Sequence, residues 1–206
     1  MSVFFTSDEH FNHENIITRF NRGFGMFNSV NHHNQHLVQK WWETVSEEDE
    51  VWVLGDAGMG DKEKSLELFR GLPGIKHLIP GNHDPLLEGL ASKNHIAKWL
   101  PLYQEVFTVH PALVERVFIT GYGPQKVLLC HFPYKATSLE RPETHAKFRP
   151  VNNGLPLVHG HSHSTEILNP NSPLEYHVGV DAHGFAPVPE TRIITWLEKL
   201  HADGVL

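Results

Sequence analysis

The sequence predicts an α/β fold with a mixed sheet or two packed sheets, and three observations lead to that class. Short apolar runs rich in β-branched and aromatic residues recur along the chain. Before Tyr103 these runs alternate with stretches of helical periodicity, whereas after it they follow one another without long helices between them. No linker divides the two halves, so we expect one domain spanning residues 1–206.

The first half reads as strands alternating with helices. The expected strands cover residues 3–6, 51–54 and 75–79. One helix is expected to end near Val45, a second to begin after an N-cap at Asp61, and a third to cover residues 86–100. This order is typical of βα units.

The second half reads mainly as strands. They are expected at residues 106–109, 113–120, 126–129, 155–158, 174–180 and 192–197, with a turn at 121–124. The polar, proline-punctuated loop of residues 133–154 is long enough to indicate a lid or wall over a site.

Composition and charge exclude several classes of protein. The net charge of −7 disfavours a partner such as an extended nucleic acid, which needs a basic face. The single cysteine, Cys130, excludes an intrachain disulfide and suits a reducing compartment. No apolar run is long enough for a membrane helix or a signal peptide, so we expect a cytoplasmic protein without a membrane partner. Whether it is a monomer or a homodimer stays open.

Polar clusters follow five of the expected strands within about two residues. They are Asp8 with His10, Asp56, Asn82 with His83 and Asp84, His131, and His161 with His163. In open α/β sheets, ligands gather beyond the carboxyl ends of the strands, so these side chains should meet along one edge. Residues two apart near a strand end can also point the same way.

The donors in these clusters suit two metal ions. Leaving His83 aside, they comprise two carboxylates, one amide oxygen and four imidazoles, about twice what one catalytic metal takes from protein. Nitrogen and oxygen donors without thiolate favour Mn²⁺, with Fe, Zn²⁺ or Ni²⁺ possible. A metal pair clamps the attacking and leaving oxygens of a phosphoryl displacement and supplies a hydroxide at neutral pH. The 17 histidines, as many as Lys and Arg together, also point to metal or proton chemistry.

In the same order, these clusters resemble the five motifs of calcineurin-like metallophosphoesterases. The matching segments are Asp8-x-His10, Gly55-Asp56, Gly81-Asn82-His83-Asp84, His131-x-Pro133 and Gly160-His161-x-His163. The opening segment, residues 8–22, is similar to the small phage and bacterial branch. The resemblance implies an αββα sandwich of two facing mixed sheets flanked by helices, with the metals at the sheet edge.

The resemblance also implies a role for each residue. Asp8, His10 and His163 would hold the first metal, Asn82, His131 and His161 the second, and Asp56 would bridge the two. His83 would donate a proton to the leaving alkoxide or stabilise the phosphorane, and Asp84 would orient His83.

One departure from the family bears on the substrate. Phosphoprotein phosphatases of the superfamily continue after Gly-Asp with an Asp-Arg-Gly segment, whereas Gly55-Asp56 is followed here by Ala57-Gly58-Met59-Gly60. Without that arginine, a small phosphodiester such as a cyclic nucleotide is the preferred substrate. The alternatives are a phosphomonoesterase, a nuclease, and a metal-binding scaffold without activity. The complete ligand set and His83 count against the scaffold.

Several other residues keep two interpretations. His13 and Arg22 either bind substrate at the mouth of the site or stabilise a loop, and Asp181 and His183 form either a substrate wall or a turn. Lys135, Arg141, Lys147 and Arg149 either grip phosphate or belong to a solvated loop. His32, His33 and His36 are expected on a solvated helix face.

Overall fold

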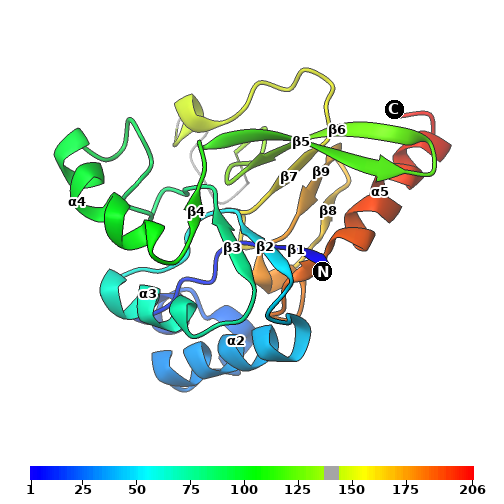
Figure 1. Cartoon of the computed structure of the whole chain (residues 1–206). Coiled ribbons are helices and arrows are strands. Elements are labelled where there is room, and N and C mark those ends of the chain that lie inside the picture. Colours follow the sequence, from blue (N-terminus) through cyan, green and yellow to red (C-terminus); the bar gives the residue numbers. More distant parts are fainter. Residues whose placement is uncertain (137–143) are drawn as a thin grey trace.

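Two five-stranded mixed sheets, flanked by helices, make up the fold, as expected for an αββα sandwich (Figure 1). The structure is a computed structural model that describes residues 1–136 and 144–206. Arg141 and the middle of the long loop lie outside the described residues, so the proposed role of Arg141 stays a prediction.

The first sheet has the order β10-β1-β2-β3-β4. Its parallel strands are β1 (Val3–Thr6), β2 (Glu50–Val53), β3 (Ile75–Leu78) and β4 (Thr108–Val109), and β10 (Val188–Pro189) pairs antiparallel with β1. The carboxyl ends of β1, β2 and β3 therefore open on the same edge, as the sequence predicted.

The second sheet has the order β5-β6-β7-β9-β8. Its strands are β5 (Leu113–Thr120), β6 (Gly123–Cys130), β7 (Leu157–His159), β8 (Leu168–Asn169) and β9 (Ser172–His177). The hairpin β5–β6 is antiparallel, whereas β6, β7 and β9 run parallel to one another. Consequently β6 and β7 also deliver their following residues to a shared edge.

Alternating side chains bind the layers together. On β1, Phe5 is buried between the two sheets with Leu129 and Val158, while Phe4 faces the helices. The helices α2 (Val30–Thr44), α3 (Lys62–Arg70) and α4 (Lys93–Gln104) pack over the outer face of the first sheet. The short helix α1 (Glu14–Thr18) and the 3-10 helices η1 (Arg22–Gly25), η2 (Ala146–Phe148) and η3 (Val180–Ala182) lie in the connections.

The last expected strand is wrong. Residues 192–197 belong to the helix α5 (Glu190–Ala202), which packs against the core between the sheets (Figure 1). Ile193, Trp196, Leu197 and Leu200 are buried on one face of it, the i, i+3, i+4, i+7 pattern of an amphipathic helix. The β-branched residues of 192–197 resemble a strand when this segment is taken alone. The helical spacing of the apolar residues becomes apparent only when Leu200 is included.

Other boundaries also moved. The helix expected over 86–100 begins only at Lys93, where the Ser92 side chain accepts a hydrogen bond from the His95 amide. Residues 106–109 contribute only the two-residue strand β4, and the predicted turn at 121–124 loses Gly123 and Pro124 to β6. The N-cap at Asp61 is confirmed, since its side chain accepts from the Lys64 amide.

Candidate metal centre

The predicted ligands follow the carboxyl ends of five strands and meet at one edge. Beyond β1 and β2 the chain stays paired, because the amides of Asp8 and His10 donate to the carbonyls of Gly55 and Asp56 at 3.0 Å each. These bonds hold the first two ligand-bearing segments side by side where the strands end.

Most of the ligands sit in left-handed backbone conformations. The φ angles are +64° for Asp8, +49° for His10, +55° for Asp56, +69° for His161 and +48° for His163. Such conformations are uncommon for residues with side chains, although Asp and His tolerate them better than most, and they concentrate at functional sites. We had expected the paired ligands to point the same way through the pleat of a continuing strand. Instead, they converge through left-handed turns.

The first cluster consists of Asp8, His10 and His163, whose ligand atoms all lie within 4.8 Å of one another. The Nε2 atoms of His10 and His163 are 3.2 Å apart. Asp8 Oδ1 lies 3.9 Å from both of them and is buried without a hydrogen-bond partner among the described residues. A buried carboxylate oxygen left unpaired beside two imidazoles fits a cation between them.

The second cluster consists of Asp56, His131 and His161, again within 4.8 Å. His131 Nδ1 donates to the Leu54 carbonyl at 2.7 Å, so its Nε2 carries a lone pair. That Nε2 lies 3.1 Å from both His161 Nδ1 and Asn82 Oδ1. The pairing of the Nε2 lone pair with the Asn82 amide oxygen brings two acceptors together, which a bound cation would stabilise.

Asp56 stands between the two clusters. Its Oδ2 atom is 3.5 Å from His10 Nε2 of the first cluster and 3.5 Å from His131 Nε2 of the second. Its other oxygen, Oδ1, accepts from the His83 amide at 2.8 Å. The residues therefore fit two divalent ions, with one carboxylate oxygen within reach of both sites.

Glycines allow this close approach at two points. A Cβ on Gly81 would come 2.7 Å from the amide of Asp56, and one on Gly160 would come 2.6 Å from Asp8 Oδ2. Both are closer than real Cβ contacts allow, so these two motif glycines are required by space around the carboxylates.

Arg22 and Asp181 contact the Nδ1 atom of His163, on the side of the ring away from the cluster. The sequence analysis did not predict these contacts. Asp181 Oδ2 lies 3.1 Å from His163 Nδ1 and accepts from Arg22 Nη2 at 2.8 Å. Burial lowers the pKa of His163, but the hydrogen bond to Asp181 and the charges of Asp8 and Asp181 together outweigh that effect and leave the pKa raised. Asp181 lies 159 residues after Arg22 in the chain, and nothing in either motif signals that they meet.

His83 and Asp84 lie beside the clusters, but Asp84 does not orient His83 as predicted. The Asp84 carboxylate accepts from the backbone amides of Gly81 and Asp56 at 2.8 Å each and of Ala57 at 3.3 Å. Among the described residues it makes no hydrogen bond to the His83 ring. Burial, with the nearby charge of Asp56 second, raises the pKa of Asp84 to about 6. Asp84 thus fixes the loop that carries Asp56.

The three predicted substrate residues have different surroundings. His13 lines the cavity in front of the clusters, and burial lowers its pKa to about 4. Arg22 reaches the same cavity, but its side chain is 1% exposed and also donates to the Glu9 carbonyl at 3.2 Å, which matches the loop-stabilising alternative. His183 does not line this cavity, its Nε2 donates to the His177 carbonyl at 2.8 Å, and its contact with substrate stays a prediction.

The cavity in front of the clusters measures about 440 Å³. Its lining includes His10, Asp56, Asn82, His83 and His161. A ligand in this space would therefore contact both clusters and the His83 ring, whose centre is 5.4 Å from that of His10.

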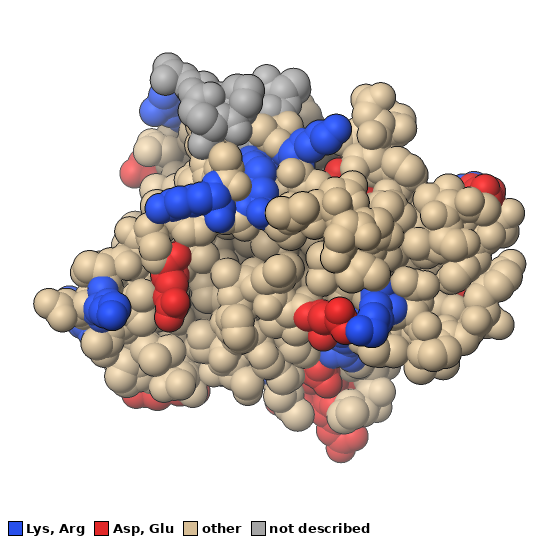
Figure 2. All heavy atoms as spheres, turned by 90° about the horizontal axis from the view of Figure 1, so that it is seen from above, with Lys and Arg blue, Asp and Glu red and all other residues tan. Residues whose placement is uncertain are grey.

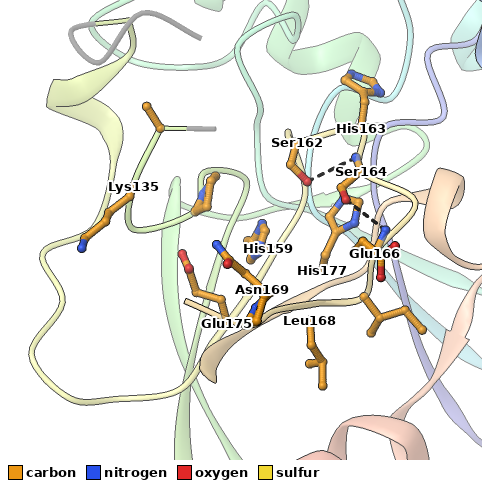
Figure 3. Close-up of a pocket in the computed structure, with 14 residues that line it drawn as sticks. Lys135, His159, Ser162, His163, Ser164, Glu166, Leu168, Asn169, Glu175 and His177 are labelled. Carbon is orange, nitrogen blue, oxygen red and sulfur yellow. Dashed lines mark hydrogen bonds between the residues drawn. The ribbon is translucent and has the colours of Figure 1, made fainter. Parts of the chain in front are cut away.

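A second cavity, of about 330 Å³, adjoins the first and shares Ser162 and His163 with it (Figure 3). His159, His177 and Glu175 line it and are buried. Burial lowers the pKa of His177 to about 3, so this imidazole is neutral at physiological pH.

The basic residues of the long loop hold backbone in place. Lys147 donates to the Gly89 carbonyl at 3.0 Å, and Arg149 donates to the carbonyls of Pro133 and Lys135. Figure 2 shows Lys and Arg side chains gathered beside the residues drawn in grey, on a face that is otherwise mostly uncharged. Of the three helix histidines expected in solvent, His33 is instead fully buried, where it contacts Arg22.

The fold and the two clusters define a mixed α/β protein with two potential divalent-metal sites. No family model matches the chain. The Gene 66 protein of Mycobacterium phage D29 is 34% identical over 93% of this chain and 94% of its own length, and that of phage L5 is 34% identical over 89% and 88%. The chain therefore belongs to the family of the mycobacteriophage Gene 66 proteins.

Two more distant proteins extend this picture. The uncharacterized protein MJ1445 of Methanocaldococcus jannaschii is 26% identical over 96% of this chain and 92% of its own. The crystal structure of AQ665 from Aquifex aeolicus, a protein of unknown function, superposes with a TM-score of 0.64 at 24% identity, covering 93% of this chain and 97% of that one. The latter shows a shared fold. None of the helices in the described part of the chain is long and apolar enough to span a membrane.

Proposed function

We propose that this protein is a metal-dependent phosphoesterase that hydrolyses small phosphodiesters. The observation that carries the proposal is the position of Asp56 Oδ2, 3.5 Å from one histidine of each cluster. Asp8, His10 and His163 would hold one divalent ion, Asn82, His131 and His161 the other, and Asp56 would contact both. Mn²⁺ is the preferred metal for this nitrogen and oxygen donor set.

Two divalent ions, when bound, would polarise the phosphoryl oxygens and activate water at neutral pH. The protein's part is to fix their ligands, and the buried contacts described above supply that rigidity. His131 is held by the Leu54 carbonyl and His163 by Asp181, at 2.7 Å and 3.1 Å. Each contact fixes a ring orientation and directs the other nitrogen toward the cluster.

His83 is the proposed general acid. It lines the cavity beside both clusters, and the bond from its amide to Asp56 Oδ1 ties it to the residue between them. From this position the imidazole would donate a proton to the leaving alkoxide. Asp84 acts at one remove, because it holds the backbone of Gly81 and Asp56.

A diester is preferred to a monoester because the described residues that line the cavity offer little free positive charge. Arg22 is engaged by Asp181 and His163, and the segment directly after Asp56, residues 57–60, contains no arginine. A monoester dianion has more charge to offset than a diester monoanion.

The phage relatives support the expectation that the protein acts in the host cytoplasm.

Hydrolysis of bis-p-nitrophenyl phosphate and p-nitrophenyl phosphate, measured side by side with and without Mn²⁺, tests the proposal. We expect metal-dependent turnover that favours the diester. His83→Ala should lower turnover by about 10²- to 10⁴-fold while the number of bound ions stays the same. His201→Ala, which removes a histidine stacked on Tyr122, is the matched control and should leave turnover unchanged.

A preference for the monoester would retain the metal centre and overturn the substrate class. Bound metal without turnover of either ester, in a protein shown to be folded, would favour the scaffold alternative. Loss of ions in His83→Ala would mean that this residue is a ligand and not the acid.

A further inference from the structure

The cavity in front of the metal-ligand clusters has an apolar wall in addition to its polar lining. Ile16, Phe20 and Phe24 contribute this wall. Phe20 is 62% exposed and Phe24 is 83% exposed. Single exposed apolar residues are ordinary, but two phenylalanines in the same cavity as the predicted ligands mark a binding surface.

The backbone under these rings is held in an unusual conformation. Phe24 has a φ of +52° and Gly23 a φ of +73°, both in the left-handed region. Phenylalanine is disfavoured there, and such residues concentrate at ligand-binding segments. Arg22 is buried and bonded to Asp181 and His163, so the segment that carries Phe24 is fixed to the metal centre itself.

We propose that Phe20 and Phe24 form an aromatic subsite, which binds a flat ring of the ester whose phosphate lies at the clusters. The ring is a nucleobase or an aryl group, since these stack on aromatic side chains whatever their hydrogen-bonding pattern. This inference rests on the proposed phosphoesterase function and names the substrate class more closely.

The adjoining cavity suits a ring less well. His159, His177 and Glu175 line its interior, and Figure 3 shows these side chains turned toward it. Burying a ring against two imidazoles and a carboxylate would leave polar groups without water or partners. Phe20 and Phe24 present exposed apolar rings to the first cavity, and the polar side chains that share its lining include His13, whose ring centre is 6.4 Å from that of Phe20.

Binding of non-hydrolysable phosphonates tests the subsite without requiring turnover. Phenylphosphonate, cyclohexylphosphonate and methylphosphonate would be titrated by calorimetry into the Mn²⁺-loaded protein. They share the phosphonate and differ in whether they carry a flat ring, a puckered ring or neither. We expect phenylphosphonate to bind about tenfold more tightly than methylphosphonate. It should also bind more tightly than the cyclohexyl compound.

Phe24→Gly is the main variant, because glycine adopts a positive φ without strain and so removes the ring while keeping the backbone. Phe20→Ala is the second. In each variant, the ratio of the affinity for phenylphosphonate to that for methylphosphonate should fall toward one. The affinity for methylphosphonate itself should stay unchanged. Tyr122→Ala, which removes an exposed aromatic ring outside this cavity, should retain the full preference.

Equal binding of phenyl- and methylphosphonate by the unaltered protein would overturn the subsite, as would a preference that survives both substitutions. Equally tight binding of the cyclohexyl compound would show apolar contact without stacking and would also overturn it. Failure of the proposed function appears separately, as absence of metal-dependent hydrolysis of either nitrophenyl ester.

Discussion

The two metal-ligand clusters match in content but differ in what holds their histidines. Each has one carboxylate and two imidazoles. In the first cluster, His163 is 34% exposed and is held by the side chains of Asp181 and Arg22. In the second, His131 is fully buried and donates to the backbone carbonyl of Leu54 at the end of β2.

Because of this difference, side-chain substitutions outside the ligands can alter the first cluster more readily than the second. A carbonyl that follows a central strand cannot be removed by substituting one side chain, whereas a carboxylate that supports a histidine can. We therefore expect the first cluster to respond to changes outside its ligands and the second to resist them. Three predictions test this contrast.

The largest effect is expected where the clusters meet. Asp56→Asn keeps the shape of the side chain but removes the charge that faces His10 and His131 at 3.5 Å each. Both ions should be lost, so metal analysis after dialysis should fall from about two ions per chain to none. Asp203→Asn, at an exposed pair with Lys199, is the control. Retention of one tightly bound ion would show that Asp56 serves a single cluster.

A smaller and one-sided effect is expected behind the first cluster. Asp181→Asn removes the carboxylate that accepts from Arg22 and supports His163. Loss of such a supporting group typically lowers metal affinity about 10- to 100-fold, so one of two binding steps in a calorimetric titration should weaken. The other step should be unchanged, because Leu54 still supports His131. Equal weakening of both steps would break the contrast between the clusters.

The clusters also differ in how far the sequence could predict them. The six residues of the two clusters and Asn82 could be chosen from the ends of apolar runs, because parallel strands deliver their following residues to one edge. Asp8, His10 and Asp56 come close together because the chain makes left-handed turns after the strands. The hydrophobic periodicity of the sequence does not predict these turns. The hydrogen-bond partners that hold the histidines could not be predicted from the sequence either. Asp181 meets His163 only through the fold, and Leu54 acts through its carbonyl.

Where the sequence failed, a local pattern competed with tertiary packing. Residues 192–197 have the β-branched content of a strand, yet the apolar spacing continued to Leu200 describes the buried face of α5. His33 was expected in solvent because its neighbours are polar, but the helix turns it toward Arg22. The family resemblance implied that Asp84 orients His83, and the fold gives Asp84 three backbone amides instead.

The smallest expected effect concerns acid stability behind the first cluster. Burial, with the charge of Arg22 second, lowers the pKa of His33 to about 3, below its ordinary 6.5. Between these values the unfolded chain binds the proton and the folded chain does not, so the stabilisation is present above pH 6.5 and is lost as pH falls toward 3. His33 would contribute at most about 1.4 kcal/mol per pH unit to the slope of the unfolding free energy.

His33→Gln should flatten that slope, as measured by urea unfolding of the metal-free protein between pH 6.5 and 4. The variant loses stability at pH 7, because Gln cannot reproduce every contact of the buried ring, but it loses less on acidification. His201→Gln, in the last turn of α5, should leave the slope unchanged. An unchanged slope in His33→Gln would mean that the Arg22 network does not connect the first cluster to acid stability.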